Sequence, residues 1–237
     1  TQFPAITPIP QQAHYELSHA QQRLWLLDKV VPDSPFYNIP GAIILDGVSL
    51  DLAVLKMAIL AVAQRHETMR TTFGTKDDMP VQVIAETAAV DIPLTDLSRK
   101  KNKEALLQEI LENEKRRPFN IETGPLYRIR VVKLAKTRHA FIIVMHHIIS
   151  DGWSMALLVQ EAVGHYLAFT EGRPSPFPPL TIQYKDFAVW QNMILASEEI
   201  KRQETYWLDK LKGELPVLIL PTDRPRPPVQ TQNGATR

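Results

Sequence analysis

Cysteine is absent from this chain of 237 residues, and its absence excludes several kinds of chemistry. Without a thiol the chain forms no disulfide, has no thiolate nucleophile and offers no thiolate ligand to a metal. The first four residues also show no signal-peptide pattern of basic and apolar segments. This composition fits a cytoplasmic location.

Long apolar runs and an excess of one charge are also lacking. The apolar run 140–145 is far shorter than the roughly 20 residues that a membrane-spanning helix needs. There are 27 basic and 26 acidic residues, giving a net charge of +1, and no stripe of Lys and Arg alternates with aromatic residues. We therefore expect neither a membrane nor a nucleic acid as a partner.

Glycine is scarce, with nine residues, whereas 19 prolines concentrate in the segments 4–10, 174–179 and 216–228, which we interpret as linkers. Between them, segments with strand and helix patterns alternate. Strands are predicted at 39–45, 68–73, 81–84, 126–134 and 140–144, and helices at 18–30, 51–66, 103–115, 154–170, 182–195 and 197–212. Ser18 and Gln21 have the spacing of a capping box at the first helix, and the turn 136–138 predicts that the strands 126–134 and 140–144 pair. The alternation predicts an α/β class, an α+β sandwich rather than a helix bundle. The tryptophans at 25, 190 and 207 are expected in the core.

The stretch 145–154, Met-His-His-Ile-Ile-Ser-Asp-Gly-Trp-Ser, joins the predicted buried strand 140–144 to the helix 154–170. Buried polar groups must find partners or cost free energy, so a protein core has little use for two histidines and an acid at this place. A strand-end turn can instead present such side chains to a cleft. We therefore interpret this stretch as a functional motif.

His147 is the candidate for the chemistry, because a neutral imidazole accepts protons near neutral pH. Adjacent side chains on an extended segment point to opposite faces, so one of His146 and His147 is structural, and spacing alone does not say which. Asp151 is placed either to pair with the imidazole or to pair with an arginine and hold the turn. Gly152 lets the backbone bend or approach a ligand, and the helix amides after it are candidates to stabilise an oxyanion.

Two other kinds of site are poorly supported. Adjacent histidines that point apart, without a third nearby histidine or any cysteine, make a poor zinc site. Ser150 and Ser154 do not lie in the Gly-x-Ser-x-Gly turn of a serine hydrolase. We expect no metal.

Several separated stretches together resemble the condensation domains of nonribosomal peptide synthetases, within the His-His-x-x-x-Asp acyltransferases that include chloramphenicol acetyltransferase. They are 18–25 (Ser-His-Ala-Gln-Gln-Arg-Leu-Trp), 65–73 (Arg-His-Glu-Thr-Met-Arg-Thr-Thr-Phe), 145–154, 184–190 (Tyr-Lys-Asp-Phe-Ala-Val-Trp), 206–207 and 220–227. Met69 stands where leucine is usual. The Arg-Leu-Trp and Asp-Gly-Trp-Ser sequences are most similar to the subtype that takes an L-configured donor.

The resemblance implies two lobes like chloramphenicol acetyltransferase, each a mixed sheet flanked by helices, with a tunnel between them. By this likeness His147 is the catalytic histidine and acts as a general base or positions the acceptor amine. Asp151 would form a salt bridge with Arg65 or Arg70, His146 would brace the turn, and Gly152 would leave room beside the thioester. The later motifs are absent, so residues 1–175 would form the first lobe and 176–237 the linker and helices that begin the second.

The implied activity is peptide-bond formation by acyl transfer from one carrier-bound thioester to the amine of another carrier-bound substrate, within a multimodular synthetase of antibiotic or secondary-metabolite biosynthesis. The implied partners are donor and acceptor peptidyl carrier proteins and an adjacent adenylation domain. No cofactor would be bound by the domain itself, since substrates arrive on phosphopantetheine arms. The isolated lobe would be inactive alone. The alternatives are a non-catalytic lobe that docks carrier proteins and a free-standing acyltransferase that uses coenzyme A thioesters.

Overall fold

The computed structural model describes residues 3–225 and 228, and the chain divides into two compact units. The first unit ends at Asn192 and the second begins at Met193. The predicted boundary at residue 175 concerns the lobes of a complete domain and stays a prediction.

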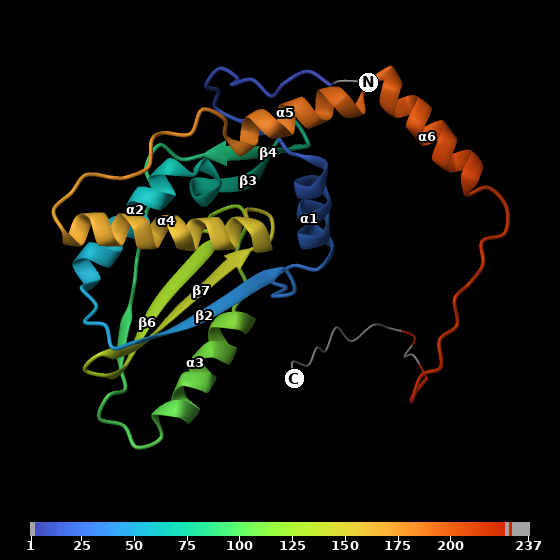
Figure 1. Ribbon diagram of the computed structural model, residues 1–237. Helices are drawn as coiled ribbons and strands as arrows, with labels where there is room; N and C mark the ends of the chain where they lie inside the picture. Colours follow the sequence, from blue (N-terminus) through green and yellow to red (C-terminus); the bar gives the residue numbers. More distant parts are fainter. Residues whose placement is uncertain (1–2, 226–227, 229–237) are drawn as a thin grey trace. The chain divides into compact units, whose positions relative to one another are not determined.

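A four-stranded sheet forms the centre of the first unit (Figure 1). Its strands are β2 (Asn38–Asp46), β7 (Arg138–His146), β6 (Tyr127–Ala135) and β5 (Leu94–Asp96), in this order. β7 is antiparallel to both of its neighbours, whereas β5 and β6 are parallel. The predicted pairing of the strand that carries the motif with the strand before it is confirmed, with Tyr127 opposite Met145.

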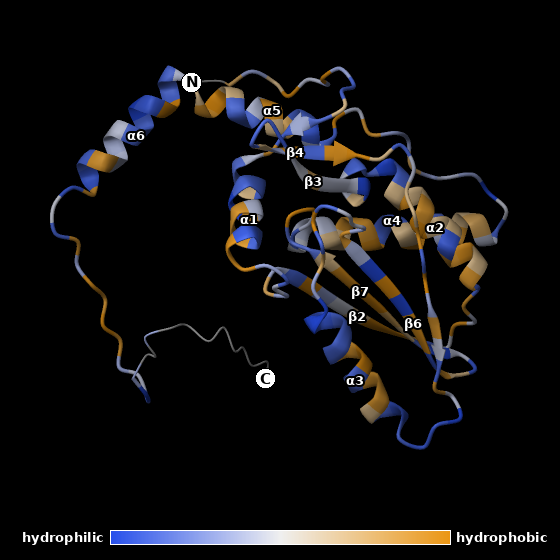
Figure 2. Ribbon diagram, turned by 180° about the vertical axis from the view of Figure 1, so that it is seen from behind, coloured by the Kyte–Doolittle hydropathy of each residue, from blue (hydrophilic) through white to orange (hydrophobic). Residues whose placement is uncertain are grey.

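Helices cover both faces of this sheet. Successive side chains on β6 point to opposite faces, so neighbouring residues of this strand contact different helices. Ile129 faces an apolar layer formed with α2 (Leu52–Arg65) and α4 (Gly152–Thr170). Its neighbours Arg128 and Arg130 pair with Glu114 of α3 (Lys103–Arg116) on the other side. Strand β7, which lies between β2 and β6, is buried along most of its length and is apolar in Figure 2, as its sequence predicts.

A smaller sheet has the order β1 (Tyr15–Glu16), β4 (Met79–Ile84), β3 (Thr71–Lys76). Next to β1 in the sequence, α1 (His19–Val30) begins with the predicted capping box of Ser18 and Gln21. The strand predicted at 68–73 is wrong in its first half, where Glu67–Arg70 form a 3₁₀ helix, η1. There the hydroxyl of Thr71 donates to the Glu67 carbonyl, a local bond that competes with sheet pairing.

Helices α5 (Tyr184–Leu195) and α6 (Glu198–Lys210) follow the second proline-rich segment. The prediction that Trp207 lies in a core is wrong, since it is 59% exposed, while Trp25 is partly buried against the core. Helical spacing identifies an apolar face but not what covers it. In the part of the chain that the structure describes, no helix has the length and apolar character to span a membrane. The predicted α/β class with sheets flanked by helices is confirmed.

Candidate active site

The motif forms a tight turn between β7 and α4, and this turn lies beside a cleft of about 450 Å³. The amide of Ile149 donates to the carbonyl of His146, which closes the turn. The amide of His147 donates to the Tyr37 carbonyl at 2.8 Å and ties the turn to the segment before β2. The cleft is lined by Ala20, Arg23, Leu24, Tyr37, His66, Thr68, His147, Ile148, Ile149, Ser150, Asp151, Ser154, Leu157, Leu180, Ile182, Gln183 and Tyr184.

The two histidines of the motif are in opposite environments. His147 is exposed and lines the cleft, whereas His146 is 3% exposed. The Nδ1 atom of His147 lies 2.9 Å from the Ser150 carbonyl oxygen. A carbonyl oxygen only accepts hydrogen bonds, so Nδ1 carries the proton of a neutral His147 and Nε2 keeps a lone pair. His147 is thus the histidine of this pair that is able to meet a substrate.

His146 is held as a neutral structural residue. Burial, with a smaller contribution from the charge of His147, lowers the pKa of His146 to about 4. Its Nδ1 accepts a hydrogen bond from the Ile148 amide at 3.1 Å, and its ring meets the edge of Phe119. These contacts fix the ring of His146 within the turn, and the bracing role that the family resemblance implies for it stays a prediction.

Asp151 caps helix α4 and does not form the salt bridge predicted with Arg65 or Arg70. It is exposed, and its Oδ1 accepts from the Ser154 amide at 2.8 Å and from the Ser154 hydroxyl at 2.6 Å. The Asp151 amide donates to the same hydroxyl at 2.7 Å, which completes a capping box. These hydrogen bonds from Ser154 lower the pKa of Asp151. Because its carboxylate binds the Ser154 amide, that amide is not free to stabilise an oxyanion, and the predicted role of the other amides at the start of α4 stays a prediction.

Both arginines have other carboxylate partners. Arg65 Nη1 lies 2.7 Å from Oε1 of Glu161, and Arg65 Nε donates to the Pro178 carbonyl at 2.9 Å. Arg70 Nη2 lies 3.6 Å from Oε1 of Glu67. Glu161, which is only 4% exposed, was not predicted from the sequence as a site residue, because a glutamate inside a helix usually lies on its solvated face.

Gly152 begins α4 and is exposed. A Cβ atom added there would meet no atom of the described chain within 4 Å. Packing within the chain therefore does not require glycine at this position, and the predicted role of leaving room for a thioester stays a prediction.

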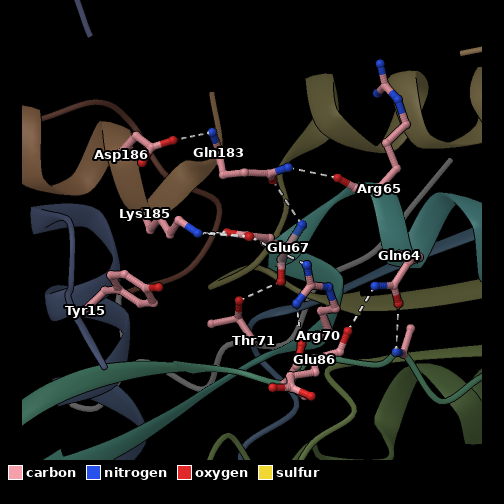
Figure 3. A network of polar contacts seen from close by, with 12 residues as sticks. Tyr15, Gln64, Arg65, Glu67, Arg70, Thr71, Glu86, Gln183, Lys185 and Asp186 are labelled. Atoms are coloured by element: carbon pink, nitrogen blue, oxygen red, sulfur yellow. Dashed lines mark hydrogen bonds and ion pairs between the residues drawn. The ribbon is translucent and has the colours of Figure 1, made fainter. Parts of the chain in front are cut away.

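One wall of the cleft, residues 180–184, is fastened to η1 by the polar network in Figure 3. The Gln183 side chain accepts from the Glu67 amide at 3.1 Å and donates to the Arg65 carbonyl at 2.9 Å. Lys185 Nζ lies 2.8 Å from Oε2 of Glu67, and Asp186 accepts from the Gln183 amide at 2.7 Å. The stretches 65–73 and 184–190, which are far apart in the sequence, thus meet at this wall of the cleft.

Comparison with known proteins gives consistent matches. The sequence profile of the condensation domain matches residues 11–237. Tyrocidine synthase 3 of Brevibacillus parabrevis is 40% identical over 99% of this chain, which spans 3% of that protein. Gramicidin S synthase 2 of Brevibacillus brevis is 39% identical over 98% of this chain, which spans 5% of it.

Two solved structures match the fold over most of this chain. The starter condensation domain of rhizomide synthetase RzmA has a TM-score of 0.77 at 28% identity, covering 85% of this chain and 48% of that one. The X-domain in its complex with OxyB from teicoplanin biosynthesis has a TM-score of 0.82 at 28% identity, covering 96% and 50%. The chain thus spans about half of these structures. Since the profile covers nearly all of its residues, the chain belongs to the condensation domain family.

Proposed function

We propose that this chain is the first part of a condensation domain that forms peptide bonds in a nonribosomal peptide synthetase. The donor is an aminoacyl or peptidyl thioester on one carrier protein, and the acceptor is the amine of a substrate on a second carrier protein. The observation that carries the proposal is the exposed His147 in the cleft, with Nδ1 fixed on the Ser150 carbonyl. The match to the condensation domain profile supports the same reaction.

In the proposed reaction, the acceptor nitrogen attacks the carbonyl carbon of the thioester. The C–N bond forms, the C–S bond breaks, and the sulfur leaves as a thiolate that takes up a proton. His147 Nε2 holds the lone pair that accepts either the amine proton or a hydrogen bond that orients the amine. His146 is unsuited to this step because it is buried and has a pKa near 4.

The proposed partners follow from the same family membership, and the proposed cellular location follows from composition. The domain would work with donor and acceptor carrier proteins and an adjacent adenylation domain of the same synthetase, as the similarity to much longer synthases supports. Substrates would arrive on phosphopantetheine arms, and the domain would bind no cofactor of its own. A cytoplasmic location is part of the proposal, since a chain without cysteine needs no oxidising compartment.

The test replaces His147 with glutamine in the full-length synthetase, with both carrier proteins loaded, and measures dipeptide formation in a single turnover. We expect a loss of at least about 100-fold, the lower end of acid–base catalysis. The matched control is His19→Gln, since His19 is exposed and does not line the cleft. A wild-type rate in a His147→Gln protein with unchanged thermal unfolding contradicts the role given to His147.

A second candidate function is protein docking without turnover. The matched X-domain was solved in complex with another protein, OxyB, which favours this alternative. It predicts that the wild-type domain retains carrier protein yet yields no dipeptide in the single-turnover assay. Product formed from acyl-coenzyme A without any carrier protein would instead indicate a free-standing acyltransferase.

A further inference from the structure

The cleft contains a second histidine besides His147. His66 lies between α2 and η1, lines the same cleft, and has a side chain that is 12% exposed. No role was predicted for it from the sequence, although it follows Arg65 in the stretch 65–73. Its position makes it part of the surface that any substrate in the cleft meets.

A buried carboxylate sets the tautomer of His66. Oε2 of Glu161 lies 2.7 Å from His66 Nε2, while Oε1 of the same residue pairs with Arg65. A carboxylate only accepts hydrogen bonds, so Nε2 carries a proton, and Nδ1 of a neutral His66 keeps a lone pair. The 3.3 Å contact between Arg65 Nη1 and His66 Nε2 then joins two donors that share one carboxylate.

The same arrangement thus occurs twice in one cleft. Nδ1–H of His147 donates a hydrogen bond to a carbonyl, and Nε2–H of His66 donates a hydrogen bond to a carboxylate. Each histidine is left with one fixed donor and one free acceptor nitrogen. Within the described part of the chain, no hydrogen bond occupies Nδ1 of His66 or Nε2 of His147.

The two rings have different partners. His147 is held by Ser150 in the turn before α4, whereas His66 is held by Glu161 within α4. The two rings are therefore fixed by separate parts of the chain, one in the turn before α4 and one on the helix itself. A substrate in the cleft is able to meet each ring with a different group.

We propose that Nδ1 of His66 accepts a hydrogen bond from an N–H group of the tethered substrate and so positions it for reaction at His147. The group is either an amide of the pantetheine arm or an N–H of the aminoacyl or peptidyl part. Glu161 and Arg65 act through His66 by holding its ring. This inference rests on the proposed function, because it takes a carrier-tethered thioester as the ligand.

The test measures condensation by the full-length synthetase with His66→Leu, which removes the acceptor, and His66→Asn, whose amide oxygen restores an acceptor near the Nδ1 position. Each is assayed with thioesters of pantetheine and with thioesters of ethanethiol, which has no amide N–H. We expect His66→Leu to raise KM about threefold to tenfold, as loss of one net hydrogen bond does, with kcat within about twofold. His66→Asn should recover part of this loss.

The substrates distinguish the two sources of the N–H group. A loss with pantetheine thioesters alone assigns the arm, and an equal loss with both assigns the aminoacyl or peptidyl part. An unchanged KM with every substrate, or a fall in kcat without a rise in KM, overturns the proposal. If His66→Leu fails to fold, the decision passes to His66→Gln, which keeps a donor toward Glu161 but lacks the δ acceptor: an unchanged KM then overturns the proposal.

His19→Leu serves as the control outside the cleft lining. Failure of this inference is distinguishable from failure of the proposed function. Loss of activity in His147→Gln combined with unchanged kinetics in the His66 variants contradicts the inference alone. Full activity in His147→Gln contradicts the proposed function.

Discussion

Asp151 offers the sharpest comparison between the structure and what the family resemblance implies. The resemblance implies a salt bridge to Arg65 or Arg70, whereas the structure makes Asp151 an exposed cap of α4 and pairs Arg65 with Glu161. The two arrangements differ in the free energy of unfolding that each carboxylate contributes. Replacing each acid by its amide therefore separates them.

The magnitudes follow from the partners. Asparagine caps a helix about as well as aspartate, so Asp151→Asn should lower the free energy of unfolding by less than about 1 kcal/mol. Asp151→Ala removes the cap and should cost about 1 kcal/mol, within a range of roughly 0.5–2 kcal/mol. Glu161→Gln removes the charge from a carboxylate that is 4% exposed and bound to Arg65, and should cost about 3–5 kcal/mol.

Urea unfolding of the three variants at pH 7 measures these differences. For a unit of this size, each kcal/mol also shifts Tm by about 2–4 °C. The pKa of Asp151 is lowered in the folded state, so its contribution is complete above the unfolded pKa of about 3.9 and declines as pH falls through the folded value. The difference between wild type and Asp151→Ala should therefore shrink below about pH 4. A cost of about 3 kcal/mol or more for Asp151→Asn would refute the capping role.

Two further predictions concern the same turn. Because the pKa of His146 is about 4 when folded and near 6.5 when unfolded, its burial destabilises the fold as pH falls. The wild type should lose about 2 kcal/mol more than His146→Gln between pH 7 and pH 5 in urea unfolding, and equal losses would contradict the buried neutral ring. Gly152→Ala should leave Tm unchanged or higher, since the added methyl meets no atom of the described chain, yet slow condensation if glycine leaves room for the thioester. An unchanged rate in the single-turnover assay would show that this room is not needed.

Local patterns were predicted from the sequence because their physical causes lie within a few residues. Ser18 and Gln21 form the expected capping box, and the apolar run before His146 forms the expected buried strand between two neighbours. The motif was correctly placed between this strand and a helix. Hydrogen bonds between residues three apart and the alternation of side chains along a strand are fixed by backbone geometry alone.

The choice between distant partners was decided only by the tertiary structure. Arg65 pairs with Glu161 rather than with Asp151, and His147 rather than His146 faces the cleft. These outcomes depend on how α2 and α4 pack and on which side of β7 the turn opens, and spacing in the sequence carries no information about either. The sequence alone thus determined the family and the position of the motif, whereas packing of segments far apart in the chain determined which ring is exposed and which charges meet.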